Sequence, residues 1–191
     1  MIAARRVGQN AQLAHQLAGG PDLAQQRAGV RVRRAGPADL DAMVALGMEV
    51  IRFDALFGGV QERPWTAGAL TAEFADTLAG PDPWMWLAER DGDPIGMLAA
   101  EKPAQAQWIA PMTASGPVSY LLLMGVRADV RAQGTGAAMA ARFHAEALAA
   151  GVSVTLLHYA QVNPLSAPFW SQQGYRPLWT CWEARPPAAW R

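Results

Sequence analysis

Hydrophobic residues in this chain fall either into short apolar runs or into stripes with helical spacing, and the two patterns alternate along the sequence. The short runs predict strands, at 30–33, 84–89, 95–101, 118–126, 152–157 and 175–183. The stripes predict helices, at 37–51, 66–78, 137–150 and 166–173. This order of segments indicates a fold of the α/β (α+β) class, with strands in a sheet and helices packed on it.

Two connections indicate how the strands pair. Asp91-Gly92 separates the strands at 84–89 and 95–101, and this dipeptide is a strong signal for an antiparallel hairpin. The helix at 137–150 links 118–126 to 152–157, so these two strands are expected to be parallel through a right-handed crossover. Open α/β sheets bind ligands at the carboxyl ends of such strands. Gly125, near one of these ends, is a candidate β-bulge.

The first 28 residues differ in composition from the rest. Alanine and glutamine dominate, and Gly19-Gly20-Pro21 interrupts the segment. We expect residues 1–28 to be a weakly anchored extension, with a short helix at 10–17, and residues 29–191 to form a single domain.

Composition narrows the range of functions. The 16 basic and 16 acidic residues cancel, which argues against nucleic acid or an anionic membrane as the main partner. The single cysteine, Cys181, excludes an internal disulfide framework and a cysteine-based zinc cluster, and we expect no metal. It suits a reducing compartment, and the N-terminus lacks the apolar core of a signal peptide, so a cytoplasmic location is expected.

The segment between the strand at 118–126 and the following helix carries the clearest chemical signal. It reads Arg131-x-x-Gly134-x-Gly136. The first N–H groups of a helix are unpaired and lie at the positive end of its dipole. Glycines let an anion approach the backbone, and Arg131 can add a full charge. We therefore expect a phosphate cradle, formed by Arg131, Ala132, Gln133, Gly134, Thr135, Gly136 and Ala137.

Other interpretations of this segment are weaker or less specific. Its glycines can simply serve a strand-to-helix turn, and a lone Gly-x-Gly does not exclude this. The dinucleotide fingerprint needs a third glycine, but position 139 is Met139. The P-loop needs Gly-Lys-Ser/Thr, which is absent.

The segment resembles the coenzyme A loop of the Gcn5-related N-acetyltransferase (GNAT) superfamily. Asn163, Trp170, Gly174 and Tyr175 follow in the order of that family's Asn…Tyr…Gly-Phe segment, and the resemblance covers about residues 30–182. It implies a mixed, mostly antiparallel twisted sheet with a central splayed parallel strand pair, flanked by helices. It also implies acetyl-CoA as cosubstrate.

The resemblance further implies where acetyl-CoA binds. Its pantetheine arm pairs with the end of the central strand in that family, at Gly125, Val126 and Arg127 here, and the N–H of Val126 polarises the thioester carbonyl. Asn163 is a candidate partner for the pantetheine amides. Further cofactor contacts are expected from Ser166, Phe169 and Trp170.

Acetylation of an amine requires a group that accepts a proton from it. His158 is the best candidate because it ends a strand at the expected site and titrates near neutral pH. Tyr159 and Glu101 are alternatives, and Tyr120 can point toward an acceptor. Trp170 stands where the family has its tyrosine proton donor, and an indole cannot give up that proton. Ser166, Tyr159 or water can replace it.

The acceptor is not specified by any motif. The helices at 37–51 and 66–78 match the substrate-facing region of the family, and Glu49, Asp54 and Glu62 there can touch a substrate. The stretch from 102 to 117, with Trp108, has no clear period and is long enough to form a binding wall.

Two functions therefore remain open. One is an N-acetyltransferase for the primary amine of a small molecule or peptide, and the other is a catalytically weak or inactive acyl-CoA-binding module or sensor. Trp179, Trp182 and Trp190 leave a homodimer open.

Overall fold

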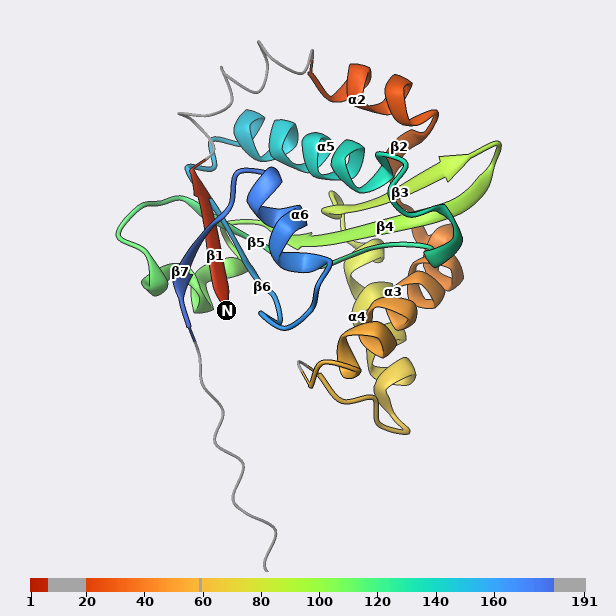
Figure 1. Cartoon of the computed structure of the whole chain (residues 1–191), viewed down its shortest axis with the longest axis horizontal. Coiled ribbons are helices and arrows are strands. Elements are labelled where there is room, and N and C mark those ends of the chain that lie inside the picture. Colours follow the sequence, from red (N-terminus) through yellow and green to blue (C-terminus); the bar gives the residue numbers. More distant parts are fainter. Residues whose placement is uncertain (7–19, 59, 181–191) are drawn as a thin grey trace, which may run out of the picture.

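The strands in the middle of the sheet are apolar at nearly every position, because both faces of the sheet are covered by helices. The computed structural model describes residues 1–6, 20–58 and 60–180 (Figure 1). Its strands are β1 (Ile2–Arg6), β2 (Arg31–Arg34), β3 (Met85–Arg90), β4 (Asp93–Glu101), β5 (Val118–Val126), β6 (Val154–His158) and β7 (Arg176–Trp179). Its α-helices are α2 (Gly20–Ala28), α3 (Leu40–Ala55), α4 (Thr66–Ala79), α5 (Thr135–Ala149) and α6 (Ser166–Gln172).

The strands form one sheet in the order β2-β3-β4-β5-β6-β1-β7. Every neighbouring pair is antiparallel except β5 and β6, which are parallel. That parallel pairing runs from Val118 opposite Val154 to Leu121 opposite Leu157, whereas β5 continues to Val126. The expected mixed sheet with a splayed parallel pair is confirmed. Among the residues that the structure describes, the last five of β5 have no partner on the β6 side.

Side chains alternate between two helical layers. On β3, Trp86 belongs to the core under α5, whereas Met85 and Leu87 belong to the core under α3 and α4. Figure 1 shows α5 and α2 on one side of the sheet and α3 and α4 on the other. Each fully buried large apolar side chain contributes about 1.5–3 kcal/mol. The two layers therefore hold the end of β5 in place from both faces.

The N-terminal segment is better anchored than its composition suggests. β1 lies between β6 and β7 and pairs with both, and Ile2 and Ala3 are each 1% exposed. α2 packs on α5 (Figure 1). The weak anchoring expected for residues 1–28 is therefore wrong for 1–6 and 20–28, while the helix expected at 10–17 lies outside the described residues. A five-residue strand with two arginines carries too little apolar periodicity to be recognised.

A buried polar cluster fixes β1 to α5. The guanidinium of Arg5 is hydrogen-bonded to Nδ1 of His144. His144 Nε2 lies 3.1 Å from the hydroxyl of Tyr175, which also accepts a hydrogen bond from Thr155 at 2.9 Å. Burial, and then the charge of Arg5, lower the pKa of His144. The histidine is therefore neutral in the folded protein.

Two further sequence predictions, about β5 and β7, differ from what the structure shows. The bulge expected at Gly125 is instead at Leu122, where the pairing with β4 shifts register, and Gly125 pairs regularly with Met97. β7 ends at Trp179, so residues 181–183 of the strand predicted there lie outside the described part of the chain. None of the described helices has both the length and the apolarity needed to cross a membrane.

Candidate active site

The loop between β5 and α5 presents a row of free backbone donors. Helix α5 begins after Gly134, and the first bond at its N-terminus runs from the N–H of Ala138 to the carbonyl of Gly134, at 3.0 Å. Within the described chain, none of the N–H groups of residues 131–137 donates a hydrogen bond, and no side chain caps the helix. These groups can therefore hold an anion such as a diphosphate without breaking existing bonds.

The two glycines of the loop also have packing roles. Gly134 has φ +87°, and a side chain there would meet Ala28 of α2 at 3.3 Å. A side chain at Gly136 would meet the ring of Phe169 at 3.2 Å. The missing side chain at Gly136 therefore makes room for the ring of Phe169 of α6. It also brings Phe169 to the edge of the expected cradle.

Arg131 does not extend along this row of donors. Its Nε donates to the carbonyl of Val126 at 3.0 Å, and its guanidinium lies 4.9 Å from the centre of the Phe53 ring on α3. The Arg90 guanidinium, which the sequence did not single out, donates to the side-chain oxygen of Gln133 at 2.7 Å and to the carbonyl of Ala28 at 3.2 Å. Arg90 therefore brings positive charge to the loop from the β3–β4 hairpin.

At the end of β5, the N–H and C=O groups of successive residues face alternately toward β4 and toward the free edge of the strand. The N–H of Arg127 donates to the carbonyl of Ile95 at 2.8 Å, so Arg127 faces β4. In an antiparallel pair this orientation recurs at every second residue. Gly125 therefore also faces β4, whereas Met124 and Val126 face the free edge. The backbone groups of Gly125 and Arg127 therefore point away from a ligand at the free edge, so the contacts expected from them are wrong. The backbone of Val126 points toward that edge, and its expected contact is compatible with the structure.

Side chains of the loop mostly point away from the donors. The guanidinium of Arg127 donates to Asp93 at 2.6 Å and to Asp129 at 2.7 Å. Thr135 is buried, at 1% exposed, and its hydroxyl has no hydrogen-bond partner in the described chain. The loop therefore offers its backbone rather than its side chains.

Asn163 links the two sides of the splayed strands. Its side-chain oxygen accepts hydrogen bonds from the N–H groups of Leu165 at 2.9 Å and Ser166 at 3.3 Å, so it caps α6. Its amide nitrogen donates to Asp54 of α3 at 2.7 Å. Burial raises the pKa of Asp54, and the bond from Asn163 counteracts that rise. The amide expected to bind pantetheine is thus already occupied by a carboxylate from the opposite layer.

His158 lies in a group of polar and aromatic side chains. Its Nδ1 is 2.9 Å from the hydroxyl of Tyr120. Trp108, from the 3₁₀ turn at Ala106–Trp108, lies beside both rings and donates from Nε1 to Glu101 at 2.8 Å. The ring of His158 is partly exposed. Burial of its other side, and then the positive charge of the Met1 amino group, lower its pKa. The structure therefore brings together His158, Tyr120 and Glu101, and adds Trp108.

Tyr159 and Trp170 are less available than the sequence suggests. The hydroxyl of Tyr159 donates to the sulfur of Met1 at 2.9 Å, and its backbone N–H donates to the carbonyl of Met1, just before β1. Trp170 is 7% exposed and packs edge-to-face against Phe169 and Tyr175, with ring centres 4.8 and 5.3 Å away. Trp170 therefore forms part of the core under α6.

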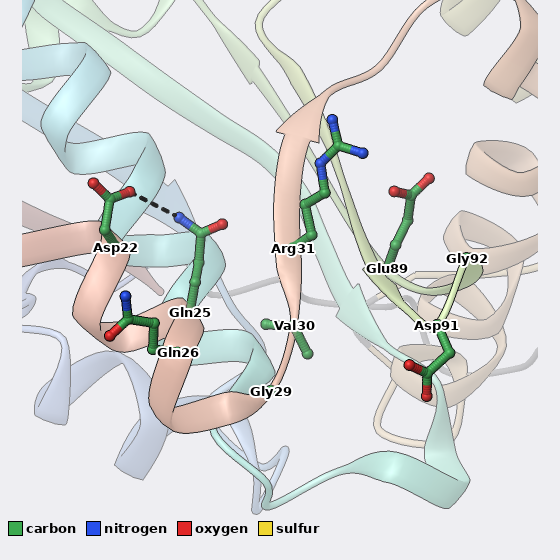
Figure 2. A pocket seen from close by; sticks show the side chains of 9 residues that line it. All are labelled: Asp22, Gln25, Gln26, Gly29, Val30, Arg31, Glu89, Asp91 and Gly92. Carbon is green, nitrogen blue, oxygen red and sulfur yellow. Dashed lines mark hydrogen bonds between the residues drawn. The ribbon is translucent and has the colours of Figure 1, made fainter.

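In the described part of the chain, histidine, cysteine, aspartate and glutamate do not gather into a group that could hold a metal ion. A surface pocket of about 600 Å³ lies between α2, β2 and the β3–β4 turn (Figure 2). Its lining residues are Asp22, Gln25, Gln26, Gly29, Val30, Arg31, Glu89, Asp91 and Gly92, and none of the predicted site residues is among them.

Solved structures of acetyltransferases share this fold. The aminoglycoside N-acetyltransferase AAC(6')-Iy in complex with CoA has a TM-score of 0.66 at 16% identity, over 83% of this chain and 95% of that chain. AAC(6')-Ih from Acinetobacter baumannii has a TM-score of 0.62 at 17% identity, over 84% and 100%. A predicted acetyltransferase with acetyl-CoA from Clostridium acetobutylicum has a TM-score of 0.60 at 18% identity, over 82% and 96%.

The sequence comparisons are more specific about the family. No curated protein matches the chain in sequence. The model of the acetyltransferase (GNAT) family matches residues 51–175, which include the end of β5, the loop, α5, β6 and α6. This match spans well over half of the chain, so the protein belongs to the acetyltransferase (GNAT) family.

Proposed function

We propose that the protein is an acetyl-CoA-dependent N-acetyltransferase that acts on a primary amine of a small molecule or peptide. The observation that carries this proposal is the row of free N–H groups at residues 131–137, next to an unpaired strand edge that begins beside His158. When bound, acetyl-CoA supplies an activated acetyl group. The residues at 131–137 would hold its diphosphate, with Arg90 and Phe169 at the margins.

The free edge of β5 would hold the pantetheine arm, and one of its amides would polarise the thioester. His158 follows Leu157, which pairs with Leu121. Val126 is four residues beyond Leu122, a distance of about 13 Å along a strand. Val126 is therefore too far away to polarise the carbonyl that an amine beside His158 would attack. The N–H of Met124 faces the same edge at about half that distance, and we assign the polarising role to it.

His158 would take the proton from the amine. Its lowered pKa keeps the ring neutral at pH 7, as a base requires. Burial raises the pKa of Tyr120 to about 12, so its hydroxyl stays protonated. A tautomer in which Nδ1 donates to the Tyr120 oxygen leaves Nε2 free to accept the proton. Tyr120 is then a positioning residue for the ring.

Neither Trp170 nor Tyr159 is placed to protonate the leaving thiolate. Trp170 is in the core, and the hydroxyl of Tyr159 is directed to Met1. A thiol with a pKa of about 8.5 leaves readily, and water can reprotonate it. The missing acid is nevertheless the observation that favours the second candidate, an acyl-CoA-binding module with little or no turnover.

A thiol-release assay distinguishes the two candidates. Acetyl-CoA is mixed with the protein and a panel of amines that includes aminoglycosides, which the names of two structural neighbours suggest. Calorimetry measures acetyl-CoA binding in parallel. Turnover that falls at least 100-fold in His158→Gln, with acetyl-CoA affinity unchanged, supports the enzyme. Tight acetyl-CoA binding without thiol release from any amine would favour the binding module.

A further inference from the structure

We infer that Trp108, Tyr120, His158 and Glu101 form the acceptor site, and that it selects a cationic amine with no carboxylate next to the amino group. This inference rests on the proposed function, since it assigns the substrate class of the same site. It adds Trp108 and Glu101 as residues that bind the acceptor. The phosphate-binding loop at 131–137 does not predict this role for either of them.

The three rings pack against one another in a single group. The ring centres of Trp108 and Tyr120 are 5.0 Å apart with planes at 74°, and those of Tyr120 and His158 are 5.6 Å apart at 69°. The Trp108 and His158 rings are parallel within 5°, with centres 6.4 Å apart. Because these rings contact one another, a ligand cation would lie on the exposed side of Trp108, within about 6 Å of its ring centre, the range over which a cation is attracted to an aromatic face.

The tryptophan of this group is both accessible and held in position. Trp108 is 57% exposed. Its Nε1 is bonded to Glu101, and the turn that carries it is anchored by Ala106 and Ile109, which are 0% and 1% exposed. A large exposed ring with a fixed orientation lowers the entropic cost of binding a ligand. The segment without clear sequence periodicity is therefore a binding wall with a fixed indole.

Glu101 gives the group a negative charge with no cationic partner. It forms no salt bridge within the described chain, and one of its oxygens accepts only the bond from Trp108. The neighbouring Lys102 is paired instead with Asp82. A positive ligand beside Trp108 would thus meet an uncompensated carboxylate, and a ligand carboxylate would be repelled.

The group lies where an acceptor amine would have to lose its proton. Glu101 pairs with Tyr120 across β4 and β5, and His158 lies just beyond the last paired residues of β5 and β6. An ammonium bound by the aromatic faces would be adjacent to His158. The ammonium would pass one proton to His158 and become the neutral amine that attacks the acetyl carbon.

Matched amines test the charge preference. Phenethylamine and phenylalanine differ only by the carboxylate next to the amino group, as do tyramine and tyrosine. We expect the protein to acetylate each amine with a kcat/KM at least 10-fold higher than its carboxylated counterpart. Glu101→Gln should reduce this preference, whereas Glu73→Gln, on the exposed face of α4, serves as the control. An equal or reversed preference would overturn the inference.

Variants of Trp108 test the aromatic contribution. Trp108→Leu should raise KM for the preferred amine roughly 3- to 30-fold, the range expected for loss of a cation–aromatic contact, with kcat and acetyl-CoA affinity within 2-fold. Trp108→Phe, which keeps a ring, should lie between. An unchanged KM in Trp108→Leu would refute the site while leaving the acetyltransferase proposal intact.

If the protein releases no thiol with any amine, the proposed function fails, and direct binding still tests the site. Equilibrium dialysis of phenethylamine against the protein with acetyl-CoA should then show binding that Trp108→Leu weakens. No binding, or binding that is insensitive to position 108, would contradict the inference.

Discussion

Because Gly125 has no side chain, Val50 of a neighbouring helix can pack closely against the sheet. Val50 of α3 lies where a β-carbon at position 125 would stand, well inside contact distance. Gly125 is therefore required by the packing of α3 on β5 and not by a bulge. Because Gly125 borders the residues that face the free edge, this packing also fixes the strand that would bind the donor.

We predict that Gly125→Ala lowers the free energy of unfolding by about 1–3 kcal/mol, the usual cost of overpacking. Denaturant titration measures it. Gly68→Ala is the matched control, because nothing lies within 4 Å of a side chain at this position on α4 and alanine favours a helix. Equal stability of the two variants would contradict the close approach of Val50.

At the same scale, the pKa of His158 sets the pH dependence of turnover. The folded protein lowers this pKa below its ordinary value of 6.5. A base is active only when unprotonated, so kcat/KM should rise with pH through a value below 6.5 and then level off. His158→Gln should lose this acid limb. A limb centred above 6.5 would argue against the described surroundings of the ring.

At the scale of elements, α3 and α6 meet through one side chain. Asn163 both caps α6 and reaches Asp54, so it holds together the two layers where the strands separate. A donor whose amides bind Asn163 would have to displace Asp54. The C-terminal turn of α3 would then change its contacts when the donor binds.

We predict that Asn163→Ala lowers the free energy of unfolding by about 1–2 kcal/mol, since it removes a helix cap and leaves the half-buried Asp54 without its partner. Thermal or denaturant unfolding measures it, and Ser171→Ala on the exposed face of α6 is the control. If Asp54→Asn, whose oxygen can still accept the bond, destabilises as much as Asn163→Ala, the charge rather than the bond is what matters.

The elements differ in how far the sequence predicts them. The strands β3, β4 and β5 are predicted because helices cover both of their faces, which makes their residues apolar in long runs. The free donors of the loop follow from glycine and helix chemistry alone. The positions of Trp108 and Asn163 depend on contacts between distant segments, as does the burial of His144, and no local period encodes such contacts. The sequence does not predict β1 for the same reason, because its pairing partners come from the other end of the chain.

At the scale of the whole molecule, the buried cluster around His144 links β1, α5 and β6. The histidine is neutral in the folded protein, with a pKa below its ordinary value of 6.5, while the unfolded chain protonates it near that value. The unfolded state therefore binds more protons below pH 6.5, and stability is complete above this pH and falls as the solution is acidified.

We predict a loss of up to about 1.4 kcal/mol per pH unit from this group once the pH is well below 6.5. Unfolding free energies measured between pH 8 and 5 test this, with His158→Gln as a comparison for a partly exposed histidine. His144→Gln should be less stable at pH 8 but should show a shallower decline on acidification. A parallel decline in the two proteins would mean that another group causes it.

The account as a whole depends on the free amides at residues 131–137, and amide NMR during a titration with coenzyme A measures them most directly. We predict that the N–H signals of these residues shift the most and become protected from exchange with water, while the amides of Gly125 and Arg127, which face β4, move less. Binding of coenzyme A that leaves the signals of 131–137 unchanged would contradict the account.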